Sequence, residues 1–426
     1  MLYSLISLGL TLTAVTGVLA KTSYDGAQAV RVAVGDDVVP LMKIIDKLSL
    51  ASWKGVGPNG VPRANGNVDL VVPAKKVAEF TALVDGMEFE VMHEDLGASI
   101  SAEEEESVSF KSSAAAAVDV TYFNAYHAYA DHLTFLRDLQ AQYPTRSEIV
   151  TAGNSNGGRP ITGIHFYGTA AGKPAVVLHG NVHAREWITG MTTEYLAWYL
   201  LTNYASSSEV KSFVDKYDFY IFPIVNPDGF VYTQTNDRLW RKNRQTTPNS
   251  SCIGRDVNRN WPFQWAVTGG ASTDPCNETF KGRAAGDATE NVGLRNYIST
   301  LAAKQKVQLF IDIHSYSQLF MTPYGYSCSA LATNNAALQS LARGTASAIQ
   351  AVYGTVYEYG PICSTIYQAT GSSVDWVNDI AKAKYTFTIE LRDTGRYGFI
   401  LPPAQILPTA LETYQGFRYL LLNMVL

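Results

Sequence analysis

The sequence has no excess of positive charge and few long apolar runs. Among its 426 residues, 33 Lys and Arg stand against 38 Asp and Glu, which gives a net charge of −5. This balance provides neither the basic surface that nucleic acids require nor the polybasic patch that anionic lipids attract. After residue 20, no stretch is apolar and long enough to cross a bilayer. We therefore expect neither nucleic acid nor a membrane among its partners.

The first 20 residues are the exception, because they are almost wholly apolar. They end in Val18-Leu19-Ala20, a spacing that is typical of a secretory signal peptide cleaved after Ala20. No Lys or Arg precedes the apolar run, so an uncleaved anchor is the alternative. We expect residues 1–20 to be a signal peptide and the rest of the chain to be secreted to the extracellular space.

Cysteine is scarce, and none occurs before residue 252. No cysteine stands in a C-x-x-C pattern, which argues against a zinc site made of cysteines. In an oxidising compartment an even number favours disulfides, here two with three possible pairings. Sequons at Asn249 and Asn277 fit an exported surface. The four cysteines are Cys252, Cys276, Cys328 and Cys363.

From residue 29 to 96 the pattern predicts a small α+β unit. Strand-like apolar runs alternate with two helical segments, and a loop rich in Gly, Pro and Asn separates the halves. The resulting β-α-β-α-β order is typical of a ferredoxin-like open sandwich. We expect strands at 29–34, 68–73 and 87–92, and helices at 36–48 and 74–86.

Between residues 101 and 119 the composition changes to glutamate, serine and alanine. The four glutamates at 103–106 are typical of a solvated helix or linker. Lys111 is followed by small residues, which makes an open and cleavable site. A small unit, a charged linker and a large unit together predict a pro-domain at 21–111, a mature enzyme at 112–426 and an activating endoprotease as a partner.

From Tyr122 onward, helical patterns alternate with short apolar runs. An amphipathic helix is expected over 122–144, ended by Pro144. Short buried strands that alternate with helices predict an α/β domain with a mixed, mostly parallel sheet flanked by helices. Four of the expected strands lie at 174–180, 218–226, 307–314 and 385–390.

Candidate catalytic groups follow these strands, because the active site of an open α/β sheet lies beyond the carboxyl ends of its strands. The first run is followed by His183-x-x-Glu186, an imidazole and a carboxylate one turn apart at a helix entrance. The third run ends on His314 and the fourth on Glu390. A catalytic zinc takes three protein ligands, and two His with one Glu form an established set. His183, Glu186 and His314 are therefore the candidate ligands.

None of the remaining histidines follows an apolar strand at the expected edge. His179 lies inside an apolar strand and is expected to be a core residue. A hydrolytic zinc site also needs a base, for which Glu390 is placed, and a cation that meets the oxyanion. The loop segments 240–244 and 256–261 both supply Arg, and composition does not decide between them. The other histidines lie on the first unit, the amphipathic helix and a strand-like run: His93, His127, His132 and His165.

Seven segments then stand in a fixed order within residues 122–426: HAREW, NPDGF, LWRKNR, DVNRNWPF, HSYSQLF, TIYQATGSSVDW and ELRDTGRYGFILP. In this order they closely resemble the A-type metallocarboxypeptidases of the funnelin (M14) family. The upstream unit resembles the activation domain of that family, by pattern more than by motif. The resemblance implies a secreted, monomeric zinc carboxypeptidase made as a zymogen, with one Zn²⁺ per chain and with the C-termini of peptides and proteins as its substrates.

The resemblance also implies a role for each matching residue. The three candidate ligands would hold the zinc, and Glu390 would activate the zinc-bound water as general base. Arg241 would polarise the scissile carbonyl and stabilise the oxyanion, while Asp256 would orient His183. The substrate-binding residues would be Arg185, Asn258, Arg259, Ser315, Tyr316, Tyr367 and Val374.

In this family Asn258 and Arg259 would clamp the terminal carboxylate of the substrate, Tyr367 would close over it, and Arg185 would be a secondary anchor. The chemistry agrees, because a carboxylate is what distinguishes a chain end from a mid-chain peptide bond. Arg offers a planar, permanently charged fork for that anion.

Substrate preference depends on the segment TIYQATGSSVDW. Family members that prefer Lys or Arg carry an acidic residue where this sequence has Val374, and the matches on both sides place Asp375 one position away. Burying a substrate cation in an uncharged pocket is costly, so we expect aliphatic or aromatic C-terminal residues to be released. Met321 leaves the size of the pocket open. The other expected lining positions are Ile362, Ile366, Ala369 and Thr388.

The resemblance pairs Cys252 with Cys276, and it pairs Cys328 with Cys363 as in some members. Three alternatives are a zinc deacylase of the same fold, a catalytically dead carboxylate-binding protein and a secreted binding module. Deacylases usually lack the Asn-Arg clamp and the Tyr cap. A dead protein requires the loss of Glu390 or a ligand, and a binding module leaves the seven segments unexplained. The sequence therefore predicts an enzyme.

Overall fold

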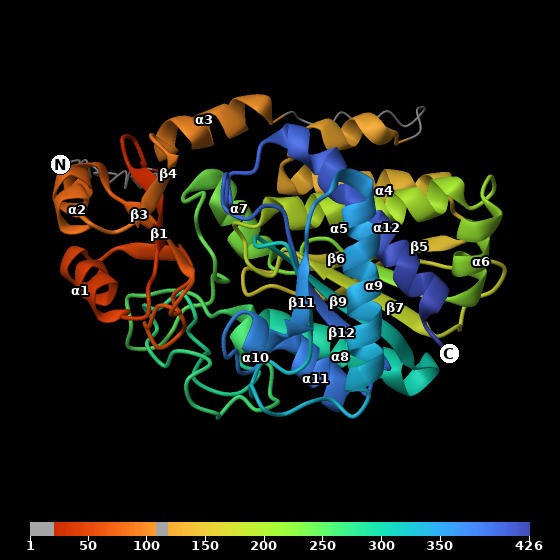
Figure 1. Cartoon of the computed structure of the whole chain (residues 1–426). Helices are drawn as coiled ribbons and strands as arrows, with labels where there is room; N and C mark the ends of the chain where they lie inside the picture. The colour runs from red at the N-terminus through yellow and green to blue at the C-terminus, as the bar shows by residue number, and fades with distance from the viewer. Residues whose placement is uncertain (1–20, 108–117) are drawn as a thin grey trace, which may run out of the picture.

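The computed structural model describes residues 21–107 and 118–426. The expected signal peptide (1–20) and the expected cleavage site at Lys111 lie outside the described residues. Figure 1 shows a smaller N-terminal unit, red to orange, beside a larger unit, yellow to blue. Within the described ranges no helix has the length and apolar character needed to cross a membrane.

The N-terminal unit is a four-stranded antiparallel sheet in the order β2-β3-β1-β4, with two helices packed on one face. This is the expected ferredoxin-like arrangement. The edge strand β2 was not expected, because four residues with a single buried side chain, Trp53, are too short to give a clear alternation. The elements are β1 (Gln28–Ala33), α1 (Val39–Leu48), β2 (Ala51–Lys54), β3 (Asn67–Val72), the 3₁₀ helix η1 (Ala74–Lys76), α2 (Val77–Leu83) and β4 (Phe89–His93).

The glutamate-rich segment continues from this unit as α3 (Leu96–Glu106), which begins where the Asp95 side chain accepts a hydrogen bond from the backbone N–H of Ala98. The expectation that all four glutamates are solvated is wrong for Glu103. This side chain is buried and accepts hydrogen bonds from Arg238 of the larger unit, with Nε···Oε2 at 2.5 Å and Nη2···Oε1 at 3.0 Å. Helical spacing turns one glutamate of the run toward the neighbouring unit.

The larger unit contains an eight-stranded sheet in the order β11-β10-β12-β9-β7-β8-β6-β5. The central pairs of β12, β9, β7 and β8 are parallel, whereas β10 pairs antiparallel with β12, and β6 pairs antiparallel with β8 and β5. The mixed, mostly parallel sheet is therefore confirmed. The strands are β5 (Ser147–Asn154), β6 (Pro160–Phe166), β7 (Ala175–Gly180), β8 (Asp218–Phe222), β9 (Val307–Ser315), β10 (Leu319–Thr322), β11 (Glu358–Pro361) and β12 (Tyr385–Leu391).

Helices cover both faces of this sheet (Figure 1), so its central strands are apolar on both sides. Alternate residues of β7 show it: Val176 and Leu178 pack with α5, α9 and α12, whereas Ala175 and Val177 pack with α8 and α11. The helices are α5 (Trp187–Asn203), α6 (Ser208–Lys216), α7 (Pro227–Thr235), η3 (Val257–Arg259), α8 (Thr289–Gln305), α9 (Asn335–Tyr353), α10 (Ile362–Thr365), α11 (Ser373–Asp379), η4 (Pro403–Gln405) and α12 (Ile406–Asn423).

The helix expected over 122–144 is shorter than predicted. The chain forms a 3₁₀ helix, η2 (Val120–Asn124), passes through an extended Ala125, and only then enters α4 (Tyr129–Gln142). The buried Tyr122 hydroxyl donates to the Glu194 carboxylate of α5, which fixes this aromatic start against the neighbouring helix. His127 therefore lies outside the helix on which it was expected.

Candidate active site

Three side chains from two segments of the chain meet at the carboxyl edge of the sheet. His183 follows β7, Glu186 is the N-cap residue of α5, and His314 lies near the end of β9. His183 Nδ1 is 2.8 Å from Glu186 Oε1, and His314 Nδ1 is 3.1 Å from Glu186 Oε2 and 3.2 Å from His183 Nδ1. All three side chains are buried.

This donor set fits zinc. Both imidazoles present Nδ1 to the same point, and their ligand atoms and those of the carboxylate lie within 4.8 Å of one another. Two imidazole nitrogens that face each other beside a carboxylate are the arrangement that a divalent cation would draw together. Within the described ranges no other group of His, Cys, Asp and Glu converges in this way.

Asp256 connects the candidate ligand His183 to the arginines of the site. Its buried carboxylate is 3.1 Å from His183 Nε2, accepts a hydrogen bond from Arg241 Nη2 at 2.8 Å, and lies 4.0 Å from Arg259 Nη1. Burial opposes ionisation, but Arg241 and His183 hold the pKa of Asp256 well below its usual value. The aspartate therefore stays ionised and fixes an imidazole and two guanidinium groups around one point.

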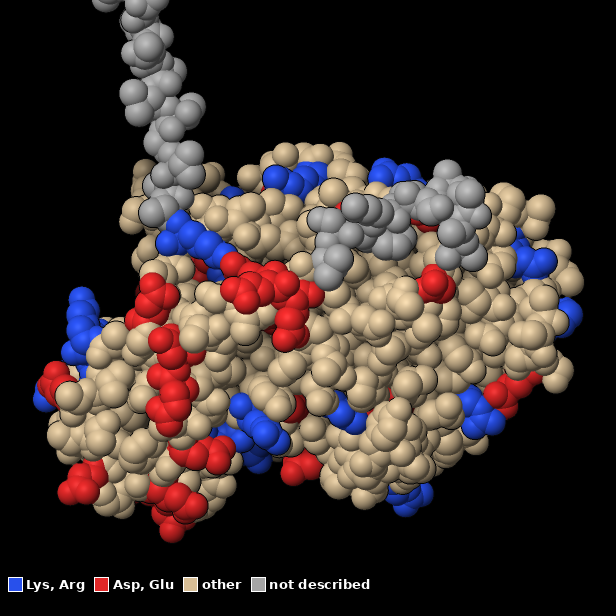
Figure 2. Space-filling model, turned by 90° about the horizontal axis from the view of Figure 1, so that it is seen from above, with Lys and Arg blue, Asp and Glu red and all other residues tan. Residues whose placement is uncertain are grey.

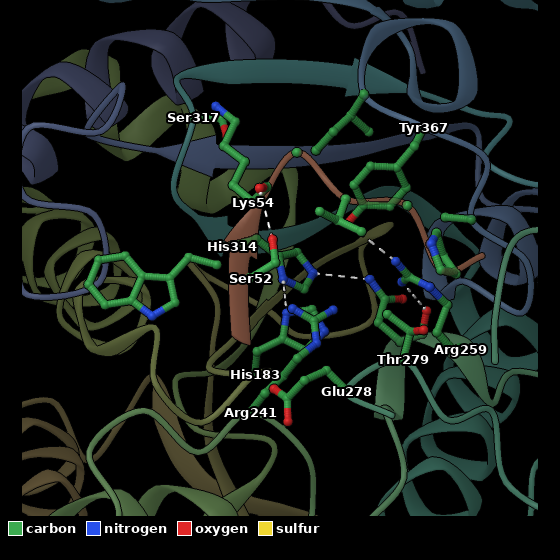
Figure 3. A pocket seen from close by; sticks show the side chains of 18 of the residues that line it. Ser52, Lys54, His183, Arg241, Arg259, Glu278, Thr279, His314, Ser317 and Tyr367 are labelled. Carbon is green, nitrogen blue, oxygen red and sulfur yellow. Dashed lines mark hydrogen bonds between the residues drawn. The ribbon is translucent and has the colours of Figure 1, made fainter. Parts of the chain in front are cut away.

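The expected carboxylate clamp surrounds the same cleft. Asn258 is in η3 with its side-chain Oδ1 accepting from the backbone N–H of Ser373 at 2.8 Å. Arg259 is buried and donates to the hydroxyl of Tyr367 at 3.4 Å. Figure 3 shows Arg259, Tyr367 and Arg241 around the hollow that also contains His183 and His314.

Glu390 lies beside the candidate ligands because β12 and β9 are adjacent parallel strands. In their register Glu390 is the partner of His314. Burial raises the pKa of the Glu390 carboxyl above its usual range; nearby His314 opposes this shift and the Glu186 carboxylate adds to it. A carboxyl group with a raised pKa is suited to accept a proton near neutral pH.

One cavity of about 510 Å³ is lined by the three candidate ligands and by Arg241, Asn258, Arg259, Tyr367 and Glu390. Its wall includes an apolar stretch formed by Met321, Ile362, Ile366, Ala369 and Thr388.

Val374 is fully buried behind this wall, in one cluster with Met321, Ile362 and Ala369. The carboxylate of its neighbour Asp375 accepts hydrogen bonds from the backbone N–H groups of Gly325 and Tyr326, each at 3.0 Å. Asp375 therefore has its own partners.

The remaining expected residues also line the cavity. Arg185 donates to the Leu239 carbonyl at 3.3 Å and lies 3.4 Å from Glu278 at the rim. The backbone N–H of Ser315 donates to Glu186 Oε2 at 3.2 Å. Tyr316 donates its hydroxyl to a residue of the N-terminal unit, the buried Asp69, at 2.6 Å.

The N-terminal unit closes one side of the cavity. Ser52 and Lys54 of β2 are among its lining residues and enter the view of Figure 3 beside His314. Asp69, which binds Tyr316, is held in place by two hydrogen bonds of 2.6 Å from Arg31. Arg63 donates to the Thr365 carbonyl at 2.6 Å, two residues before Tyr367. None of these contacts was foreseen from the sequence.

Both disulfides have the pairing that the resemblance implied. Cys252 is bonded to Cys276, and Cys328 is bonded to Cys363 at α10, close to Tyr367. His179 is a core residue, as expected: it is buried, and burial lowers its pKa to about 4.

One residue of the site was missed. Asp312 stands two positions before His314 on β9, so both side chains point to the same face, and its Oδ2 is 3.2 Å from His314 Nε2. The signal was the pattern Asp-x-His at the end of a buried strand, where a charged residue needs a partner.

Comparisons with known proteins agree with this geometry. Residues 132–416 match the zinc carboxypeptidase family, and residues 35–103 match the carboxypeptidase activation peptide. The metallocarboxypeptidase A of Arthroderma otae is 49% identical over 405 residues, which cover 94% of this chain and 93% of that protein. Bovine carboxypeptidase A1 is 34% identical, with 93% of this chain and 94% of that protein covered.

Solved structures show the same arrangement of both units. Thrombin activatable fibrinolysis inhibitor has a TM-score of 0.85 at 27% identity, covering 94% of this chain and 99% of that one. Carboxypeptidase A from Helicoverpa armigera has a TM-score of 0.79, also at 27% identity, covering 93% of this chain and 97% of that one.

Proposed function

The chain belongs to the zinc carboxypeptidase family and carries the activation peptide of that family, and we propose that it is a secreted zymogen whose mature form removes aliphatic or aromatic residues from the C-termini of peptides and proteins. It is a zinc-dependent peptide hydrolase. The finer parts of the proposal concern the role of each residue, the preference for the released side chain and the route of activation.

We assign the zinc ligands as His183, Glu186 and His314, one zinc per chain. When bound, zinc supplies Lewis acidity for the scissile carbonyl and makes water easier to deprotonate. The assignment is supported by the convergence of two Nδ1 atoms and one carboxylate on a single buried point. The Asp256 carboxylate holds Nε2 of His183 and so fixes the direction in which the His183 Nδ1 points.

Glu390 is assigned as the general base. It takes a proton from the attacking water and returns it to the leaving amine, for which its position beside His314 and its raised pKa are suitable. Arg241 is assigned to the oxyanion, because its guanidinium is held by Asp256 on the side of the cleft where the ligands lie.

The observation that carries the proposal is the position of Arg259. A single carboxylate, Asp256, lies 3.1 Å from the ligand His183 and 4.0 Å from Arg259. A guanidinium so close to the ligands can bind a substrate carboxylate while the adjacent peptide bond lies at the reacting centre, which limits cleavage to the last bond. Asn258 adds a second polar group to this clamp, and Tyr367 lies over it.

The apolar stretch of the cavity supports a preference for apolar C-terminal side chains. Val374 carries no charge, and the Asp375 carboxylate is bound by the Gly325 and Tyr326 backbone. A substrate lysine in this pocket would lose its hydration without finding a carboxylate. We assign Arg185, Ser315 and Tyr316, which line the rest of the cavity, to binding the substrate residues that precede the C-terminal one.

We propose that residues 1–20 are a signal peptide, 21–111 the pro-domain and 112–426 the catalytic domain of a secreted, extracellular monomer. An activating endoprotease would cut between the two units. The pro-domain covers the site through Ser52, Lys54 and the Asp69–Tyr316 hydrogen bond. Figure 2 shows acidic side chains gathered on the N-terminal unit and basic ones scattered singly, so the face in view offers no broad basic surface for nucleic acid.

The proposal is tested with the full chain after trypsin treatment. Blocked dipeptides that differ only in a C-terminal Phe, Leu, Lys or Arg are compared, with and without a zinc chelator. We expect turnover of the Phe and Leu substrates, none of the Lys and Arg substrates, and loss of all turnover with the chelator. Faster cleavage of the Lys substrate would contradict the assigned preference, and activity that survives chelation would contradict the zinc mechanism.

A further inference from the structure

The two proposed histidine ligands have similar surroundings, and this similarity points to a residue with no assigned role. His183 turns Nδ1 to the ligand cluster and Nε2 to the carboxylate of Asp256, at 3.1 Å. His314 turns Nδ1 to the same cluster and Nε2 to the carboxylate of Asp312, at 3.2 Å. Both aspartates are fully buried.

Asp312 has few other partners. The Ser373 hydroxyl donates to the same oxygen, Oδ2, and Oδ1 has no hydrogen-bond partner among the described residues. His179 is its register partner on β7, but neither ring nitrogen of His179 has a partner within the described chain. A buried carboxylate is costly unless it is paired, so its contact with His314 needs a physical reason.

Binding of a metal ion to the proposed ligands supplies that reason. An imidazole that offers the lone pair of Nδ1 to a metal carries its proton on Nε2, and this N–H then needs an acceptor. Two groups lie 3.2 Å from His314 Nε2, the Asp312 carboxylate and Asn258 Nδ2. The Asn258 amide is oriented by Ser373, whose backbone N–H donates to Asn258 Oδ1, so it presents a donor to the imidazole. Only the carboxylate can accept.

We propose that Asp312 is a positioning residue for the zinc site, which holds the Nε2–H of His314 and thereby sets the ring orientation and the basicity of Nδ1. This rests on the proposed ligand set. Carboxylates behind ligating histidines typically contribute about 10- to 100-fold to metal affinity. Asp312 is the cleaner of the two to test, because Asp256 also binds Arg241 and the Asn258 backbone.

The test is the zinc affinity of the full, uncleaved chain carrying Asp312→Asn, measured by competition with a chromogenic chelator. The amide keeps the volume but removes the charge, and we expect the zinc Kd to rise about 10- to 100-fold. Asp218→Asn is the matched control, because this buried carboxylate lies 3.3 Å from His165 Nε2, outside the site, and should leave the zinc Kd unchanged. A zinc Kd for Asp312→Asn within about twofold of the wild type would overturn the proposal.

The melting temperature of the metal-free proteins separates positioning from a purely structural role. A structural role would lower the melting temperature of metal-free Asp312→Asn and leave the zinc Kd of its folded fraction unchanged, which would also overturn the proposal. If Asp312→Asn does not fold, Ser373→Ala replaces it: the hydroxyl that holds Oδ2 is lost, and the zinc Kd should rise by a smaller factor, about two- to fivefold. An unchanged Kd there counts equally against the proposal.

The ligand set itself is tested in the same assay with wild-type chain and His314→Ala. If the wild type binds no zinc, or if His314→Ala binds it equally tightly, the proposed function fails. If both behave as expected and Asp312→Asn still binds zinc like the wild type, only the role of Asp312 fails.

Discussion

The proposed catalytic centre and the unit that covers it are held by different kinds of contact. At the centre, buried groups from separate segments contact one another. The single carboxylate of Asp256, for example, lies against His183, Arg241 and Arg259. The cover is attached by separate polar contacts, among them Glu103 with Arg238, and Asp69 with Tyr316. Within the centre every group belongs to the larger unit, whereas each of these attachments joins the two units.

This difference suggests how one chain can be both latent and preassembled. Because no member of the ligand set or the clamp comes from residues 21–107, we infer that removal of the cover leaves the centre complete. The buried ion pair between Glu103 and Arg238 is strong only while both partners are present, since the loss of one partner costs about 3–5 kcal/mol. Cleavage of the chain between the two units would allow all of the contacts between them to be lost at once.

The largest effect is expected at the centre, from Glu390→Gln in the activated enzyme. Loss of the proposed base should lower kcat by about 10²- to 10⁴-fold, because the amide cannot accept the proton of water. The rate is measured with a blocked Phe dipeptide, and zinc content serves as the control, since Glu390 is not an assigned ligand. An unchanged rate at normal zinc content would remove Glu390 from the mechanism.

The next largest effect is expected at the cover, from Glu103→Ala in the uncleaved chain. Arg238 would remain buried without its carboxylate, and a loss of about 3–5 kcal/mol should raise the open, active fraction by at least about 10²-fold. Hydrolysis by uncleaved protein measures this fraction. Glu105→Ala is the matched control on the exposed side of the same helix and should stay latent. Equal latency of both variants would show that the ion pair does not hold the cover.

Val374→Asp places a charge directly behind the apolar wall of the cavity. A carboxylate there should raise the ratio of kcat/KM for Lys-ended over Phe-ended dipeptides by about 10- to 100-fold, because the substrate cation gains a partner. Val374→Ala enlarges the site without adding charge and should keep the apolar preference. If Val374→Asp binds zinc normally and its ratio is unchanged, Val374 does not determine specificity.

The smallest effect is expected from Tyr316→Phe, which removes one hydroxyl and leaves Asp69 paired with Arg31. A hydrogen bond to a charged group contributes about 1.5–3 kcal/mol, and because Asp69 keeps Arg31 as a partner we expect the lower end of this range, which lowers latency by about tenfold. Because Tyr316 is also assigned to substrate binding, the measured quantity is the ratio of rates before and after trypsin. A ratio equal to that of the wild type would exclude this contact from latency.

The sequence predicted the centre better than the cover, for a physical reason. His183 follows one buried strand, and His314 and Glu390 lie near the ends of two others. Because parallel strands end at one edge, a one-dimensional pattern already indicates which side chains meet. Their catalytic roles stay predictions. The spacing of Asp312 and His314 gave the same kind of signal, but a contact between two side chains of one strand is less conspicuous than a motif that follows a strand.

The cover depended on contacts that no local pattern contains. Which glutamate of the run at 103–106 is buried is decided by the surface that α3 meets, and the edge strand β2 exists only because β3 is beside it. The start of α4 was misplaced for a similar reason, since Tyr122 is fixed by Glu194, 72 residues away. Long-range partners override helix patterns in such segments.

The most direct test compares one preparation before and after trypsin, with zinc content and hydrolysis of a blocked Phe dipeptide measured on both samples. If the centre is complete in the larger unit and the smaller unit only covers it, zinc content stays at one per chain while kcat/KM rises steeply, and a chelator abolishes the gain. Loss of zinc on cleavage, or equal activity before and after it, would contradict this account.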